Sequence, residues 1–274
     1  MKIQHATHPD DLAGLDDDAI RSRFLEDGLF VDGQVTLTYT HHDRMILGGV
    51  ALRAGESVEL PVPTELRSAT FCQRRELAVV SVGGSADVTV DGTSYRLVRG
   101  DVLYIGRGAG AIGFAGSEDG GALFLASALA HTSFPTRLVR LADASATAAG
   151  ALETANRRII HKHLHADGVQ TAQLVLGITA LEPGSVWNSM PPHLHDRRTE
   201  AYLYFDLPAD HRIAHYMGTP GSVRTITMKN LEAVVSPSWS LHFGTGTTNY
   251  AFVWVMAGEN QDFADMDQIA VTDL

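Results

Sequence analysis

The chain has 274 residues, of which 45% are hydrophobic, so it can form one large domain or two ordinary ones with a substantial core. Its net charge of −11 and lack of a basic block exclude nucleic acid as an expected partner. A single cysteine, Cys72, excludes an intrachain disulfide and fits a reducing compartment. No signal-peptide core and no membrane-spanning apolar run occur, so we expect a cytoplasmic protein with no membrane partner.

Residues 16–27 predict one short helix, because acids stand at its start and Gly28 can provide the C-cap. Strand signals dominate after it. The first group is short and β-branched or aromatic, and covers residues 35–41, 76–82, 86–90, 94–98 and 101–106. An Asp91-Gly92 pair predicts a hairpin turn, and residues 121–130 are expected to form a buried strand.

Residues 141–155 are rich in alanine, and we expect them to connect two halves of the chain with some helix. Strand signals then resume in segments 171–181, 201–205, 212–217, 224–228, 232–236 and 249–258. The acidic tail, residues 259–274, is expected to wrap an edge of the second half.

The strongest chemical signal is a set of three histidines and one glutamate. His193, His195 and Glu200 lie close together in the sequence, and His242 follows much later. In an extended strand the side chains of residues two apart point to the same face, so His193 and His195 can reach one ion. Three imidazoles and one carboxylate suit zinc, iron, manganese or nickel.

The two halves, residues 1–145 and 146–274, resemble a weak internal repeat. Aligning Glu76 with Glu200 places non-ligating residues at the other ligand positions, namely Ala69, Phe71 and Ala111. We therefore expect an N-terminal half without a metal site and one ion per chain. Short strands, duplicated halves and this ligand set together predict an all-β duplicated cupin (bicupin), with double-stranded jelly-roll barrels and short helices.

Several segments, most of all residues 190–205, 236–247, 250–261 and 263–274, resemble the 5-dehydro-4-deoxy-D-glucuronate isomerase family of the cupin superfamily, also called 4-deoxy-L-threo-5-hexosulose-uronate ketol-isomerases. The resemblance covers almost the whole chain. It implies an aldose–ketose isomerase that interconverts 5-dehydro-4-deoxy-D-glucuronate and 3-deoxy-D-glycero-2,5-hexodiulosonate in pectin and uronate breakdown. It also implies zinc held by His193, His195, Glu200 and His242, and a hexameric homo-oligomer.

Such an isomerase moves a proton between neighbouring carbons through an enediol, and a metal stabilises the charge on the oxygens. The sequence does not identify the general base, but Glu200 and Tyr202 are candidates, and Tyr204 shares their strand face. A substrate carboxylate calls for an arginine, for which Arg158 and Arg198 are the candidates, with Arg157 beside them.

Three alternative functions stay open. The 5-deoxy-glucuronate isomerases of inositol catabolism share the implied fold and metal pattern, and the same ligands suit an iron-dependent cupin dioxygenase. A sugar-binding protein without turnover is the third. A further histidine group, His161, His163 and His165, is interpreted as part of a polar strand or loop rather than as a second metal site.

Overall fold

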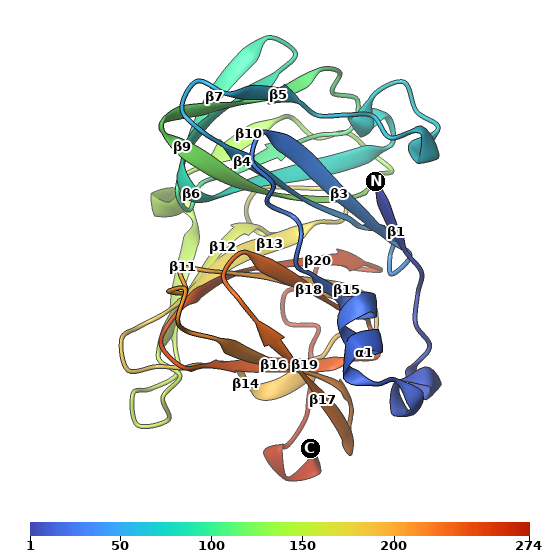
Figure 1. Ribbon diagram of the computed structural model, residues 1–274, viewed down its shortest axis with the longest axis vertical. Coiled ribbons are helices and arrows are strands. Elements are labelled where there is room, and N and C mark those ends of the chain that lie inside the picture. Colours follow the sequence, from blue (N-terminus) through green and yellow to red (C-terminus); the bar gives the residue numbers. More distant parts are fainter. The chain divides into compact units, whose positions relative to one another are not determined.

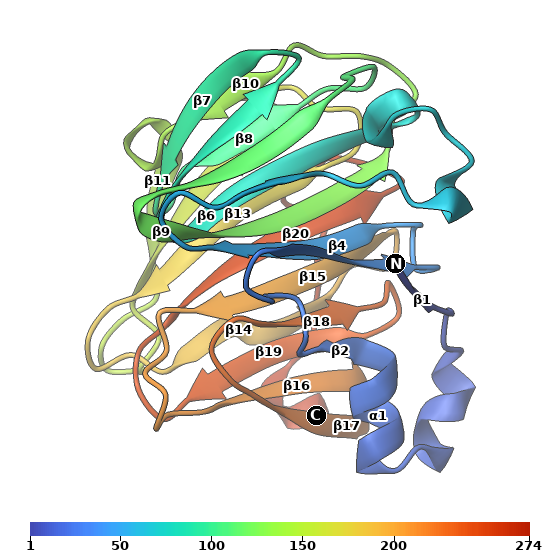
Figure 2. The ribbon, with the colours of Figure 1, turned by 45° about the horizontal axis from the view of Figure 1, so that its top comes forward.

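Short strands make up most of the regular structure in a computed structural model that describes all residues from Met1 to Leu274 (Figures 1 and 2). The chain divides into two units, and neither is one continuous stretch. The first contains residues 1–4, 28–144 and 163–175, and the second contains residues 5–27, 145–162 and 176–274.

The first unit is built on one nine-stranded sheet. Its main order is β1 (Lys2–Gln4), β3 (Gln34–Thr40), β4 (Ile46–Leu52), β9 (Ile112–Leu129), β6 (Arg75–Val90), β8 (Val102–Ile105) and β10 (Arg137–Val139). β5 (Ser57–Glu59) pairs with β9, and β7 (Thr93–Val98) pairs with β6. The long strands β6 and β9 bend through register shifts, so they contribute at both ends to one apolar core.

The second unit contains two sheets, which Figure 1 shows one above the other. The seven-stranded sheet has the order β11 (Ser145–Ala149), β12 (Arg158–Leu164), β13 (Val175–Leu181), β20 (Ala251–Gly258), β15 (Arg198–Phe205), β18 (Glu232–Ser236) and β2 (Leu25–Glu26). The five-stranded sheet has the order β17 (Ser222–Met228), β16 (Ile213–Thr219), β19 (Leu241–Gly246), β14 (Trp187–Leu194) and β21 (Asp267–Gln268). Strands β14, β15 and β19 carry most of the predicted metal ligands.

Most predicted strands are confirmed, and so is the hairpin turn. Asp91 and Gly92 adopt φ angles of 48° and 83°, the left-handed conformation that this tight connection between β6 and β7 requires. The predicted buried strand at residues 121–130 is the second half of β9. Strand β21 pairs with β14, so the tail adds to a sheet edge as expected.

Two local predictions are wrong. Asp16 is the N-cap of helix α1 (Asp17–Phe24), and its side chain accepts a hydrogen bond from the Ala19 N–H, but the helix ends well before Gly28. Its C-cap is Leu25, because Leu25 and Glu26 extend into β2 and pair with β18.

The connection at residues 141–155 contains only a 3-10 turn, Leu141–Asp143, and then the strand β11. Pairing of β11 with β12 prevails over the helix propensity of its alanines. The remaining helical segments are also 3-10 turns, at Pro9–Gly14, Thr64–Leu66, Phe71–Gln73 and Val271–Asp273. No helix combines the length and the apolar character needed to cross a membrane.

Candidate metal centre and pocket

The four predicted ligands meet inside the second unit. His193 lies in β14 opposite His242 in β19, and Glu200 lies in β15 of the other sheet. Glu200 Oε2 is 2.7 Å from His242 Nε2, 2.9 Å from His195 Nε2 and 3.9 Å from His193 Nε2. All four ligand atoms lie within 4.8 Å of one another, which fits coordination of a single ion.

Backbone carbonyls orient the imidazole rings. His195 Nδ1 is 2.9 Å from the Asp265 carbonyl, and His242 Nδ1 is 3.2 Å from the Ser240 carbonyl. His193 hydrogen-bonds the backbone at Pro191, where the carbonyl is the only polar group. A carbonyl only accepts, so the Ser240 contact favours the His242 tautomer with its proton on Nδ1. His195 Nδ1 also lies 3.0 Å from Arg198 Nη2. The Nε2 atoms of His195 and His242, which face Glu200, are the atoms that would bind a cation.

Burial sets the charge states of the group. It lowers the pKa of His193 to about 3, with a further contribution from His242, so this ring is neutral near pH 7. Burial alone would raise the pKa of Glu200, but the contacts with His195 and His242 hold it below its usual value. Imidazole nitrogens and a carboxylate oxygen together form a donor set that suits a divalent transition metal.

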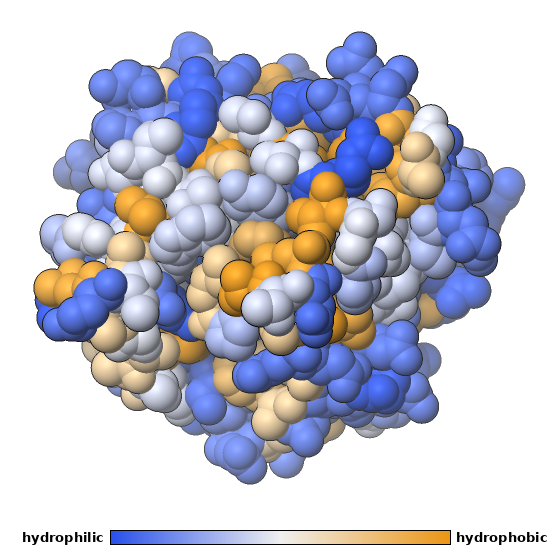
Figure 3. Space-filling view, turned by 90° about the horizontal axis from the view of Figure 1, so that it is seen from below, coloured by the Kyte–Doolittle hydropathy of each residue, from blue (hydrophilic) through white to orange (hydrophobic).

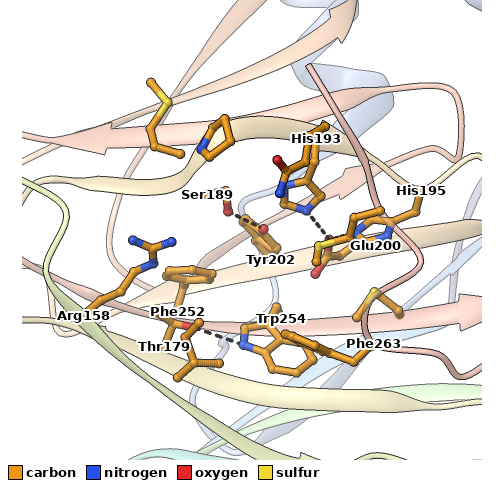
Figure 4. A pocket seen from close by; sticks show the side chains of 16 residues that line it. Arg158, Thr179, Ser189, His193, His195, Glu200, Tyr202, Phe252, Trp254 and Phe263 are labelled. Carbon is orange, nitrogen blue, oxygen red and sulfur yellow. Dashed lines mark hydrogen bonds and ion pairs between the residues drawn. The ribbon is translucent and has the colours of Figure 1, made fainter. Parts of the chain in front are cut away.

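A cavity of about 170 Å³ opens beside this group. Its lining surface is mostly apolar, although several polar side chains reach it. The lining residues are Arg158, Ile160, Thr179, Ser189, Met190, Pro191, His193, His195, Glu200, Tyr202, Phe252, Trp254, Met256, Phe263, Met266 and Gln268. His193 and Glu200 lie on one side of this pocket, and Arg158 lies on the opposite side (Figure 4). One end of the pocket can thus bind a metal cation, and the other end carries the positive charge of Arg158.

Arg158 has no carboxylate partner in the structure. Its Nη1 donates one hydrogen bond, of 2.8 Å, to the Asn156 carbonyl. Burial lowers the pKa of Arg158, and nearby Tyr202 and Tyr250 partly offset this effect. A desolvated guanidinium with free donors in a pocket can bind a carboxylate in bidentate geometry.

Tyr202 reaches the same pocket, whereas Tyr204 does not. The Tyr202 hydroxyl hydrogen-bonds Ser189 Oγ at 2.8 Å, and burial raises its pKa well above the ordinary value, so it stays protonated. Tyr204 is absent from the pocket lining, and its hydroxyl hydrogen-bonds His215 Nδ1 at 2.8 Å. Two residues on one strand face therefore differ in their access to a ligand.

Arg198 is not part of the pocket lining. It is fully buried, and its Nη2 donates to the Asp265 carbonyl at 2.7 Å, the carbonyl that also orients His195. Arg198 therefore contacts the carbonyl group that holds a predicted metal ligand, and it does not face the pocket. Arg157 forms an ion pair with Glu182. Of the further histidines, His161 and His163 lie in β12, and only the predicted four residues form a metal-ligand cluster.

The sequence did not identify the contribution of the C-terminal tail to the site. Phe263, Met266 and Gln268 line the pocket, and the Asp265 carbonyl orients His195. The Asp265 carboxylate is tied to Arg197 and to Asn260. The acidic composition of the tail predicted a segment at a sheet edge, but it did not predict that the tail lines the pocket. Every residue has a backbone carbonyl, so the sequence cannot show which carbonyl contacts His195.

The family model described as the KduI/IolB family matches residues 25–272. A relative from Kineococcus radiotolerans is 45% identical over the full length of both chains, and one from Cereibacter sphaeroides is 47% identical over all of this chain and 98% of its own. Both are named 4-deoxy-L-threo-5-hexosulose-uronate ketol-isomerase.

Solved structures share the fold at low sequence identity. An IolB-like protein from Salmonella typhimurium LT2 gives a TM-score of 0.70 at 20% identity, over 82% of this chain and 87% of that one. Bacillus subtilis oxalate decarboxylase, studied for its Mn(II) centres, gives 0.55 at 13% identity, over 82% and 71%. The predicted all-β cupin fold is thereby confirmed.

Proposed function

The chain belongs to the KduI/IolB family, and from this premise we propose that it is a metal-dependent ketol-isomerase. Its substrate pair would be 5-dehydro-4-deoxy-D-glucuronate and 3-deoxy-D-glycero-2,5-hexodiulosonate, in the breakdown of pectin-derived uronates. The full-length relatives with this activity in their name support the proposal. The observation that carries the proposal is a pocket with the predicted metal ligands on one side and Arg158 on the other. The substrate likewise has a carbonyl and hydroxyl group at one end and a carboxylate at the other.

At the first end, His193, His195, Glu200 and His242 would hold one metal ion, which we propose to be zinc. When bound, it acts as a Lewis acid on the carbonyl and hydroxyl oxygens of the substrate. The geometry around Glu200 supports both its roles in the proposal. Oε2 contacts two histidines, whereas Oε1 makes no hydrogen bond within the protein. Oε1 is therefore the candidate acceptor for the proton that leaves carbon.

Tyr202 would donate a hydrogen bond to the substrate oxygen on which negative charge develops. Its hydroxyl lines the pocket and is protonated at neutral pH, and Ser189 fixes its direction. At the second end, Arg158 would bind the carboxylate and so orient the reacting carbons. We assign Arg198 a positioning role instead, since it stabilises the carbonyl that orients His195.

We also propose a cytoplasmic homo-oligomer, a hexamer by resemblance. One supporting feature is an aromatic stack of Trp187, Tyr216 and Phe243 on the five-stranded sheet, in which the Tyr216 and Phe243 rings lie 4.5 Å apart. Trp187 and Tyr216 are partly exposed. Figure 3 shows hydrophobic side chains in the middle of one face and a mainly hydrophilic rim. Apolar surface with a polar rim is common at subunit contacts.

Turnover assays with two substrates test the function. We expect the metal-loaded protein to isomerise 5-dehydro-4-deoxy-D-glucuronate much faster than 5-deoxy-glucuronate, without consuming oxygen. Preference for 5-deoxy-glucuronate would instead support the second candidate function, which the joint family description and the IolB-like neighbour favour. Oxygen uptake coupled to product formation would overturn both in favour of a dioxygenase.

A further inference from the structure

Arg75 is a buried cation in the first unit that the proposed reaction does not use. It is 3% exposed, and its Nε donates to Ser127 Oγ at 3.0 Å. Its Nη2 donates to the carbonyls of Ser127 and Arg44. No carboxylate pairs with it, and Nη1 makes no hydrogen bond within the protein. Burying a charge without a counter-charge is costly, so an anion at Nη1 would be strongly favoured.

The neighbouring carboxylate, Glu76, does not neutralise this charge. Successive residues of β6 point to opposite faces of the sheet. Glu76 accepts hydrogen bonds from the Tyr104 hydroxyl and from the backbone N–H groups of residues 172–174. Its lone pairs are therefore used by other donors, and Arg75 is left without a carboxylate partner.

Arg75 lies in the wall of a cavity of about 300 Å³. The other lining residues combine a second arginine and several polar groups with an apolar rim: Met1, Ile3, Tyr39, His41, Glu65, Leu66, Ser68, Arg74 and Leu129. Arg74 forms no ion pair, and its Nη1 hydrogen-bonds the carbonyls of Leu66 and Arg67 and the Ser68 hydroxyl. The Tyr39 ring lies under the Arg75 guanidinium, 5.8 Å from Cζ to the ring centroid.

We propose that this cavity is a second ligand site, which binds a small organic monocarboxylate through Arg75. The guanidinium and Arg74 supply charge and donors for a carboxylate, and Ile3, Leu66 and Leu129 supply contact for an apolar portion. The single acidic residue of the lining, Glu65, is exposed and disfavours ligands with several negative charges. The site is separate from the metal-centre residues and independent of the proposed isomerase activity.

Calorimetric titration of the full-length, metal-loaded protein with pyruvate, at ionic strength held constant with sodium chloride, tests this site. We expect one pyruvate per chain, and Arg75→Met should weaken its binding by about tenfold or more, the loss expected for a hydrogen bond to a charged group. Arg53→Met is the matched control, because Arg53 is an exposed arginine of the same unit that pairs with Asp32. Arg53→Met should bind pyruvate like the unmodified protein. Arg158→Met removes binding at the metal-centre pocket, and the site that depends on Arg75 should remain in that variant.

A second variant protects the test against misfolding of Arg75→Met. Ser68→Trp fills the cavity and leaves Arg75 in place, so it should also abolish pyruvate binding. Absence of saturable binding to the unmodified protein, or equal affinity in Arg75→Met or Ser68→Trp, would overturn the proposal. A crystal structure of the assembly in which a carboxylate of another subunit binds Arg75 Nη1 would also overturn it. The Arg75 charge would then form an ion pair between subunits and would not bind a small ligand.

Discussion

At the scale of single residues, Arg158 links the shape of the pocket to the choice of substrate. It is the only arginine in the pocket lining, and it lies across from His193 and Glu200. From the sequence, Arg158 and Arg198 were equal candidates for binding the substrate carboxylate. The sequence does not show which of the two side chains faces the pocket. Only the packing of the tail shows that Arg198 serves the Asp265 carbonyl.

Replacing Arg158 by Met should lower kcat/KM for the uronate by roughly 10- to 150-fold, since a hydrogen bond to a charged group contributes about 1.5–3 kcal/mol. Metal content should stay unchanged, because Arg158 does not contact the ligands. Steady-state kinetics and elemental analysis measure both quantities. Arg157→Met is the control, as its ion pair with Glu182 is partly exposed, and it should behave like the unmodified enzyme. Equal losses in both variants would remove the carboxylate role from Arg158.

Cys72 gives a test of the packing of the first unit. Burial raises the pKa of its thiol to about 12, so almost no thiolate exists at pH 8 in the folded protein. A thiol reagent should therefore label the native protein very slowly at pH 8 and label it fully after unfolding in guanidinium. Mass spectrometry reads the label. Rapid labelling of the native protein would contradict the burial of Cys72 in the apolar core of the first unit.

At the scale of elements, sequence patterns predicted strands better than their ends and connections. Segments rich in β-branched and aromatic residues became β6, β15 and β20, which are buried along most of their length. The end of α1 and the alanine-rich β11 were missed for a shared reason. Both depend on pairing with another strand, β2 with β18 and β11 with β12, and local propensity does not contain that information.

The tail, residues 259–274, is the element whose role in the site is most testable. Deleting it removes the Asp265 carbonyl, three pocket-lining residues and β21, so metal content and turnover should both fall severely. Deleting only residues 271–274, an exposed 3-10 turn and the last residue, should change neither. Metal analysis and activity of the two truncated proteins test this. Full metal content without residues 259–274 would exclude the tail from the site.

At the scale of the whole molecule, the duplicated cupin was predictable because its signal is spread over the entire chain. The arrangement of units along the chain was not, since residues 5–27 and 163–175 each belong to the unit that their sequence neighbours do not.

We expect a stable homo-oligomer, a hexamer by family resemblance. The partly exposed aromatic stack of Trp187 and Tyr216 would be costly to leave in water. Light scattering at micromolar concentration should give a mass several times that of one 29.5 kDa chain. Tyr216→Asp should weaken the assembly if this stack lies at a subunit contact. A monomeric unmodified protein at that concentration would contradict the expectation.

The central claim is that one metal ion, held by His193, His195, Glu200 and His242, makes this chain an isomerase of 5-dehydro-4-deoxy-D-glucuronate. The most direct measurement is turnover of that substrate while chelator-treated protein is titrated with zinc. We predict that activity is nearly absent without metal, rises in proportion to added zinc, and reaches its plateau at one ion per chain. Full turnover by the metal-free protein, or a plateau only at two ions per chain, would contradict the account.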